Sequence, residues 1–149
     1  MPSSQIVIVE DNDDDFEALE FALADAAIDP PDLVRFATGE EALLYLRGGE
    51  TRSYRDGYQP TPAVVYLDLN LPGIGGHEVL AAIKTDRHLR MIPVIVLTTS
   101  SDRNDIDRCY RAGANSYLVK PLDMTQFLNM IVRVREYWHN TVCLPSGFE

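Results

Sequence analysis

The sequence has little cysteine, no long apolar run and few basic residues, and each shortage excludes a class of protein. Cys109 and Cys143 stand alone, with no CxxC spacing and no matching histidine cluster, so neither a zinc site nor a redox pair is expected. No apolar stretch approaches the roughly 20 residues of a membrane span. The first residues lack the basic and apolar regions of a signal peptide. These absences predict a cytoplasmic protein that keeps both thiols reduced and does not cross a membrane.

The shortage of basic residues argues against a nucleic-acid partner. The chain of 149 residues has 13 basic and 23 acidic side chains, a net charge of −10, whereas binding phosphate backbones needs a basic face. Half of the acidic excess lies in one short segment, which contains Glu10, Asp11, Asp13, Asp14 and Asp15. Such a segment is expected to bind a cation, to lie at a helix N-terminus, or both.

Apolar runs and helical patterns alternate along the chain, which predicts a doubly wound α/β fold. Thr38 with Glu41, and Asp123 with Gln126, have the spacing of helix N-terminal caps. Residues 48–62 have the composition of a long loop. The expected strands are 5–9, 33–37, 63–67, 93–97 and 116–119, and the expected helices are 13–27, 39–47, 76–84, 104–110 and 124–138.

This alternation fits a single domain with a five-stranded parallel sheet and five helices, the flavodoxin-like arrangement. The domain is expected to span residues 1–138. Residues 139–149 are expected to be a C-terminal extension that is too short for an output domain.

Four short polar strings follow four of the expected strands. They are Glu10-Asp11, the string from Asp68 to Pro72, Thr98-Thr99-Ser100, and Lys120-Pro121. In an open parallel sheet, ligands bind at the carboxyl ends of the strands, so these strings are expected to converge. Two carboxylates, a hydroxyl and an ammonium suit a divalent cation and a phosphoryl group.

The carboxylates suggest both a nucleophile and a metal site. Asp68, directly after a buried strand, can attack phosphorus and form an aspartyl-phosphate, although an Asp in a turn before Pro72 is also common. Magnesium prefers octahedral oxygen ligands, and Asp11, Asp68 and a backbone carbonyl near Asn70 can supply them, with Glu10 acting through a water. For the three aspartates at 13–15, the favoured interpretation is that they offset a helix dipole.

Thr98 and Lys120 complete the expected phosphoryl site. The Thr98 hydroxyl can donate a hydrogen bond to one phosphoryl oxygen, and the Lys120 ammonium can neutralise another. Taken singly, each is equally typical of an ordinary strand threonine or an exposed turn lysine. The four strings together, in this order, are much more specific.

This set of strings resembles the receiver domain of bacterial two-component response regulators, over residues 5–137. Asp68 and Thr98 are 30 residues apart and Thr98 and Lys120 are 22 apart, which matches that family, as do Ala112-Gly113-Ala114 and Tyr117. The resemblance implies that Asp68 accepts a phosphoryl group, and that Glu10, Asp11, Asp68 and Asn70 bind Mg²⁺. It also implies a protein that is not an enzyme acting on a separate substrate.

The resemblance also implies a conformational switch. In that family Thr98 and Lys120 contact the phosphoryl group. Movement of Thr98 vacates space for the aromatic ring of Tyr117, and Lys120-Pro121 is usually a cis peptide.

The long loop and the apolar tail resemble single-domain regulators that partner phytochrome-type histidine kinases. Such a kinase is therefore the expected partner, and a homodimer is expected through the last helix and the tail. Apolar residues cover more of that helix than packing on a sheet requires. The alternative is that the tail folds back onto its own domain. The expected contacts are Phe127, Met130, Val134, Trp138, Val142 and Leu144.

Two alternatives from other classes stay open. A haloacid-dehalogenase-type phosphatase needs a second aspartate two residues after the nucleophile, where this chain has Asn70. A receiver-like interaction module would keep the fold without phosphorylation. His77, His88 and His139 are scattered and are interpreted as surface or helix-end residues, not metal ligands.

Overall fold

Strands and helices alternate along the chain, as the apolar pattern predicts. The computed structural model describes residues 5–24, 31–48 and 61–145. The strands are β1 (Gln5–Val9), β2 (Asp32–Phe36), β3 (Val64–Leu67), β4 (Val94–Thr98) and β5 (Ser116–Val119). The helices are α1 (Asp13–Ala24), α2 (Gly39–Leu46), α3 (Gly76–Thr85), α4 (Arg103–Ala112) and α5 (Met124–Asn140).

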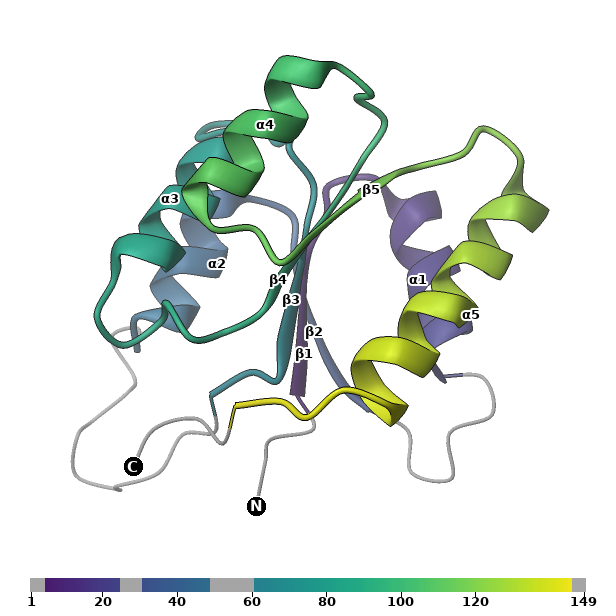
Figure 1. Cartoon of the computed structure of the whole chain (residues 1–149), viewed down its shortest axis with the longest axis horizontal. Coiled ribbons are helices and arrows are strands. Elements are labelled where there is room, and N and C mark those ends of the chain that lie inside the picture. Colours follow the sequence, from purple (N-terminus) through teal and green to yellow (C-terminus); the bar gives the residue numbers. More distant parts are fainter. Residues whose placement is uncertain (1–4, 25–30, 49–60, 146–149) are drawn as a thin grey trace.

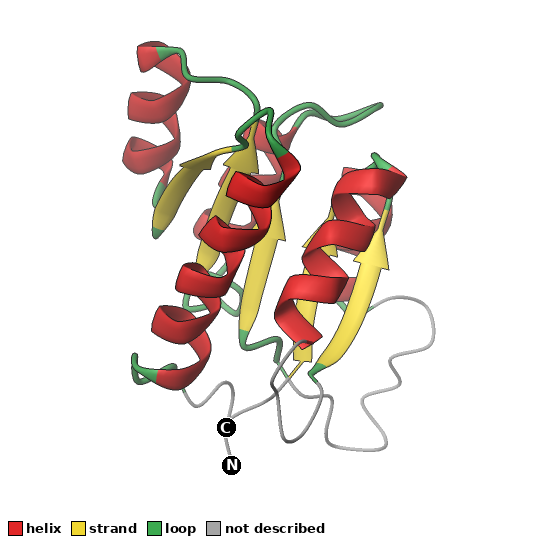
Figure 2. Cartoon of the chain, turned by 90° about the vertical axis from the view of Figure 1, so that its right-hand side faces the viewer, coloured by secondary structure: helices red, strands yellow, loops and turns green. Residues whose placement is uncertain are grey.

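The five strands form one parallel sheet in the order β2-β1-β3-β4-β5. Helices α1 and α5 cover one face of the sheet, and α2, α3 and α4 lie on the other (Figure 1). All strand arrows point the same way, with α1 and α5 in front of the sheet (Figure 2). From β1 the chain adds β2 on one side of the sheet, and then β3, β4 and β5 on the other side. The strand order therefore changes direction between β1 and β3, and ligands bind at such a point in doubly wound folds. The predicted fold class is confirmed.

The sheet is buried on both faces, which explains the continuous apolar runs of its strands. Ile6 and Ile8 of β1 face the layer of α1 and α5, whereas Val7 and Val9 face the layer of α2 and α3. Each layer therefore receives alternate residues of the same strand. The central strands are fixed in place by apolar packing on both sides, and their carboxyl ends are held rigidly.

The predicted helix caps are present. Thr38 Oγ1 accepts a hydrogen bond from the Glu41 amide at 3.2 Å, and Asp123 Oδ1 accepts one from the Gln126 amide at 2.9 Å. Helix α4 is longer than predicted at both ends because Asp102 caps its start and Gly113, with φ 107°, ends it in the left-handed conformation. The predicted end of the first helix and most of the predicted 48–62 loop lie outside the described residues.

Helix α5 and the tail pack onto their own domain, which corrects part of the predicted dimer surface. Phe127 is only 3% exposed and belongs to the core between α5 and the sheet, so it is not a surface contact. Met130, Val134, Trp138 and Leu144 are partly buried against the same core, and Val142 is half-buried. The apolar stripe of α5 is wide because it packs against α1 and the tail as well as the sheet.

None of the helices in the described part of the chain combines the length and apolar composition needed to cross a bilayer.

Candidate functional site

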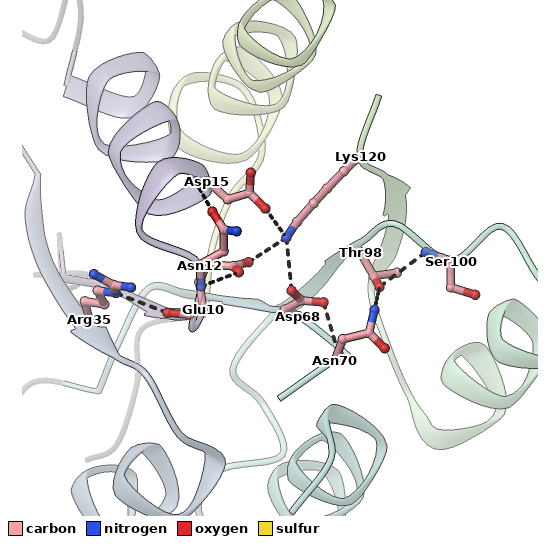
Figure 3. Close-up of polar contacts among 9 residues, drawn as sticks. All are labelled: Glu10, Asn12, Asp15, Arg35, Asp68, Asn70, Thr98, Ser100 and Lys120. Atoms are coloured by element: carbon pink, nitrogen blue, oxygen red, sulfur yellow. Dashed lines mark hydrogen bonds and ion pairs between the residues drawn. The ribbon is translucent and has the colours of Figure 1, made fainter. Parts of the chain in front are cut away.

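The carboxyl ends of β1, β3, β4 and β5 bring the selected polar residues together at one edge of the sheet (Figure 3). The Asp68 amide donates to the Val9 carbonyl at 3.0 Å, and the Lys120 amide donates to the Thr98 carbonyl at 2.7 Å. These backbone hydrogen bonds continue the sheet just beyond its strands. They fix the points from which the acidic and basic side chains project.

Lys120 lies at the centre of the site. Its ammonium donates to Glu10 Oε2 at 2.7 Å, to Asp15 Oδ2 at 2.8 Å and to Asp68 Oδ2 at 3.0 Å. Burial opposes the charge of Lys120, but its hydrogen bonds to Asp15 and Glu10 and the charges of Glu10 and Asp68 outweigh it, so the pKa of Lys120 is raised. Lys120 is therefore a permanent cation, and it compensates buried carboxylates.

Three carboxylates form a group that fits a divalent cation. Glu10, Asp11 and Asp68 each offer one oxygen within 4.8 Å of the others, with Glu10 and Asp68 buried and Asp11 exposed. Burial, and then the negative charge of Asp68, raise the pKa of Glu10 to about 7 against the hydrogen bond from Lys120. An added cation would relieve this repulsion. A set of oxygen donors open to water on one side is also what magnesium requires.

Asn70 and Thr98 line the side of the site opposite Glu10. The Asn70 amide donates to Asp68 Oδ1 at 3.1 Å and so orients the carboxylate. The Thr98 hydroxyl oxygen lies 3.5 Å from Asn70 Nδ2 and 3.4 Å from the Ser100 amide. Thr98 is fully buried, so its hydroxyl is held between two loops beside Asp68.

Asp15 is a member of this site that was not predicted. It was expected, with its two neighbours, to offset the dipole of the first helix, whereas in the structure its carboxylate accepts a hydrogen bond from Lys120. Asp15 lies four residues after Asp11. Because Asp11 precedes α1, which begins at Asp13, this spacing is not a helical one and gave no signal for the contact.

Arg35 and Glu40 were also missed, and both hold loops of the site. Arg35 of β2 donates to the Glu10 carbonyl at 3.1 Å and to Asp13 Oδ1 at 2.7 Å, with its guanidinium 4.6 Å from the centre of the Phe16 ring. Glu40 at the start of α2 accepts a hydrogen bond from the Ile74 amide at 2.7 Å. The charged residue inside the β2 run was the signal for Arg35. No sequence pattern pointed to Glu40.

Two histidines lie at helix ends, as predicted, and each also makes a contact with another element. His77 Nε2 lies 3.0 Å from Asp105 Oδ1, and His77 Nδ1 lies 3.7 Å from the buried thiol of Cys109. His139 does end a helix, but it is half-buried and its Nε2 lies 2.9 Å from the Tyr66 hydroxyl of the core. Both are contacts between elements, which composition alone does not reveal.

The predicted switch region contains Tyr117 and the Lys120–Pro121 peptide bond. The Tyr117 hydroxyl donates to the Ser100 carbonyl at 2.9 Å, which links β5 to the loop after Thr98. The expected cis peptide is absent: all peptide bonds of the described residues are trans. Trans is ordinarily the lower-energy isomer of an X–Pro bond, by about 0.5–1 kcal/mol.

A comparison with known families matches residues 6–132 to the response regulator receiver domain. The chain belongs to this family. Its predicted membership is confirmed.

Relatives of the receiver include phytochrome response regulators. Response regulator Rcp1 of Synechocystis sp. is 34% identical over 146 residues, covering 98% of this chain and 96% of Rcp1. The crystal structure of the phosphorylated cyanobacterial phytochrome response regulator RcpA is 37% identical, with TM-score 0.89 over 97% of this chain and 99% of RcpA. RPA3017, a response regulator in red light signaling of R. palustris, is 35% identical, with TM-score 0.81 over 99% and 100% of the two chains.

Of two further matches, one covers a smaller share of both chains and the other is a metal-bound structure. The probable methanogenesis regulatory protein FilR2 of Methanothrix harundinacea is 44% identical over 100 residues, 67% of this chain and 61% of FilR2. Rcp1 has also been solved in a Mn²⁺-bound form.

Proposed function

We propose that this receiver takes a phosphoryl group onto Asp68 from the phosphohistidine of a histidine kinase of phytochrome type. The observation that supports this proposal best is the environment of Asp68. Its carboxylate is buried, oriented by the Asn70 amide, and contacted by Lys120 beside a group of metal-binding carboxylates. A buried carboxylate next to a cation and a divalent metal site is suited to attack phosphorus and to hold the product.

In the proposed transfer, an Asp68 oxygen forms a bond to phosphorus while the bond from phosphorus to the kinase imidazole nitrogen breaks. The electron pair of that bond stays on the imidazole. When bound at Glu10, Asp11, Asp68 and the Asn70 carbonyl, Mg²⁺ supplies neutralisation of the phosphoryl oxygens. The positive charge of Lys120 neutralises a further phosphoryl oxygen. The Thr98 hydroxyl can donate a hydrogen bond to another phosphoryl oxygen.

Thr98 and Tyr117 connect Asp68 to the molecular surface near α4 and β5. In the proposed switch the Thr98 hydroxyl turns toward the new phosphoryl group, and Tyr117 exchanges its hydrogen bond to Ser100 for a more buried position. The loop between β4 and α4 then moves relative to β5. The phosphorylation state would thereby be displayed on the face formed by α4, β5 and α5.

The phytochrome-type kinase is proposed on the basis of the relatives. RcpA is a phytochrome response regulator and RPA3017 acts in red light signaling, and both match this receiver over nearly the whole of each chain. We also propose that the receiver is not an enzyme on a separate substrate and that it catalyses only its own phosphorylation and dephosphorylation. The homodimer stays a prediction.

The acceptor is tested by labelling with acetyl phosphate and with a phosphorylated histidine kinase, each in the presence of magnesium. Asp68→Asn is expected to abolish labelling, and Asp107→Asn on α4 to retain it. Label on Asp68→Asn would exclude Asp68 as the acceptor. A wild-type protein that neither takes label nor binds beryllofluoride would instead be a receiver-like interaction module.

A further inference from the structure

The ammonium of Lys120 has its full complement of hydrogen-bond partners. A protonated lysine has three N–H donors, and here they go to Glu10, Asp15 and Asp68. A phosphoryl oxygen on Asp68 can therefore receive a hydrogen bond from Lys120 only if one of these carboxylates releases it.

Asp15 can be released by Lys120 at a lower cost than Glu10. The side chains of Glu10 and Asp68 are 2% and 6% exposed, whereas that of Asp15 is 28% exposed. If Lys120 turned away, the carboxylate of Asp15 could be hydrated by water, whereas the buried carboxylate of Glu10 would be left without compensation. Asp68 itself loses its carboxylate charge on phosphorylation, and the charge that Lys120 compensates there moves to the phosphoryl oxygens. Asp15 is also absent from the metal-binding group.

Asp15 is not required to cap α1. The Asp15 amide donates to Asn12 Oδ1 at 2.9 Å and the Phe16 amide donates to the Asn12 carbonyl at 3.0 Å, so Asn12 is the residue that caps the helix. The carboxylate of Asp15 instead reaches across to Lys120, 105 residues later in the chain. Its partner is thus the phosphoryl-binding lysine and not its own helix.

We propose that Asp15 is a positioning residue that holds Lys120 in the unphosphorylated arrangement and so opposes binding of the phosphoryl group. This inference rests on the proposed function of Asp68. Asp15 acts in two ways: it competes for one donor of Lys120, and its negative charge repels the dianionic group that would form on Asp68. Phosphorylation exchanges the Asp15–Lys120 ion pair for one between Lys120 and the phosphoryl group.

The experiment measures the affinity for beryllofluoride with saturating magnesium by fluorine NMR. Asp15→Asn keeps the size of the side chain and removes its charge. Asp14→Asn is the matched control, because Asp14 is an exposed acid in the same helical turn. Asp15→Asn is expected to bind about fivefold more tightly than wild type, the size of effect that a partly exposed ion pair allows. Asp14→Asn is expected to match wild type, and Asp15→Glu to bind less tightly than Asp15→Asn.

A second measurement separates positioning from a structural role. Magnesium affinity without beryllofluoride is expected not to rise in Asp15→Asn, because losing an acid cannot favour a cation. If α1 were merely loosened, affinity for both ligands would fall, and that result would overturn the inference. Equal affinity of Asp15→Asn and Asp14→Asn for beryllofluoride would overturn it too.

Comparison of the wild-type protein with Asp68→Asn separates the proposed function of Asp68 from the proposed role of Asp15. Binding by wild type and none by Asp68→Asn would support the proposed function, whatever Asp15 does. Absence of binding by wild type would contradict the proposed function itself.

Discussion

Among single residues, Gly76 shows how closely the backbone is packed around the acceptor. Gly76 opens α3, and its amide donates to the Leu69 carbonyl at 3.0 Å. A Cβ atom at this position would overlap the backbone carbonyl oxygen of Asp68 and the Cα of Leu69. The first turn of α3 can therefore lie against the acceptor loop only because residue 76 has no side chain, and this contact helps to orient Asp68.

Gly76→Ala is expected to destabilise the protein by about 2 kcal/mol, the usual cost of forcing extra volume into a packed region. It is also expected to lower the yield of phosphorylated protein, because the loop carrying Asp68 must shift. Gly75→Ala is the control: its Cβ would lie 3.8 Å from the Leu69 carbonyl oxygen, an ordinary contact. Urea unfolding and acetyl phosphate labelling of the two variants check this. Equal stabilities would contradict it.

Among the helices and strands, the C-terminal end of α5 contacts β3 through His139 and Tyr66. The two side chains meet at 2.9 Å on the α1–α5 face of the sheet. Burial, and then the positive charge of Arg135, lower the pKa of His139 from 6.5 to about 4. Folding therefore keeps His139 neutral at a pH where the unfolded chain would protonate it.

The free energy of unfolding is expected to fall as the pH drops from about 6.5 to about 4, by up to about 3 kcal/mol from this residue. Within that window the unfolded state binds a proton at His139 that the folded state does not, so acid favours unfolding. Below about 4 both states are protonated and this contribution becomes constant. Urea unfolding across the pH range measures it. His139→Gln should reduce this slope and His88→Gln should not; the same slope in wild type and His139→Gln would exclude this residue as the cause.

On the scale of the whole molecule, the site and the tail lie at opposite ends. The strands end at the edge that carries Asp68, whereas residues 141–145 run beneath the other edge of the sheet (Figure 1). Leu144 packs there against the α1–α5 core. We therefore expect the tail to contribute to stability and to have little direct effect on the edge that carries Asp68.

Removal of residues 139–149 is expected to lower the free energy of unfolding by about 2–3 kcal/mol, because the half-buried side chains of Val142 and Leu144 and the His139 contact are lost. The affinity for beryllofluoride should change little. Light scattering of both proteins tests the predicted homodimer: dimerisation through the tail requires a dimeric full chain and a monomeric truncated one. An unchanged mass would exclude the tail as the dimer contact.

Much of the fold and the site was predictable from local patterns. The apolar strand runs are continuous because both faces of a parallel sheet are buried, and Thr38 and Asp123 cap helices through contacts within three residues. Asp68, Thr98 and Lys120 were selected because polar residues at the ends of parallel strands must share an edge. For the same reason Glu10 and Asp11 were expected beside Asp68.

The order of elements, the family and the polar residues at the carboxyl edge of the sheet could be predicted from the amino acids alone, because they depend on periodicity and on where each strand ends. The side-chain pairs that meet across elements follow only from the folded chain: Asp15 with Lys120, Arg35 with the Glu10 carbonyl, and His139 with Tyr66. The tertiary structure also decided that Phe127 is core and not surface. Such pairings depend on how helices rotate and pack on the sheet, and spacing along the chain does not record that.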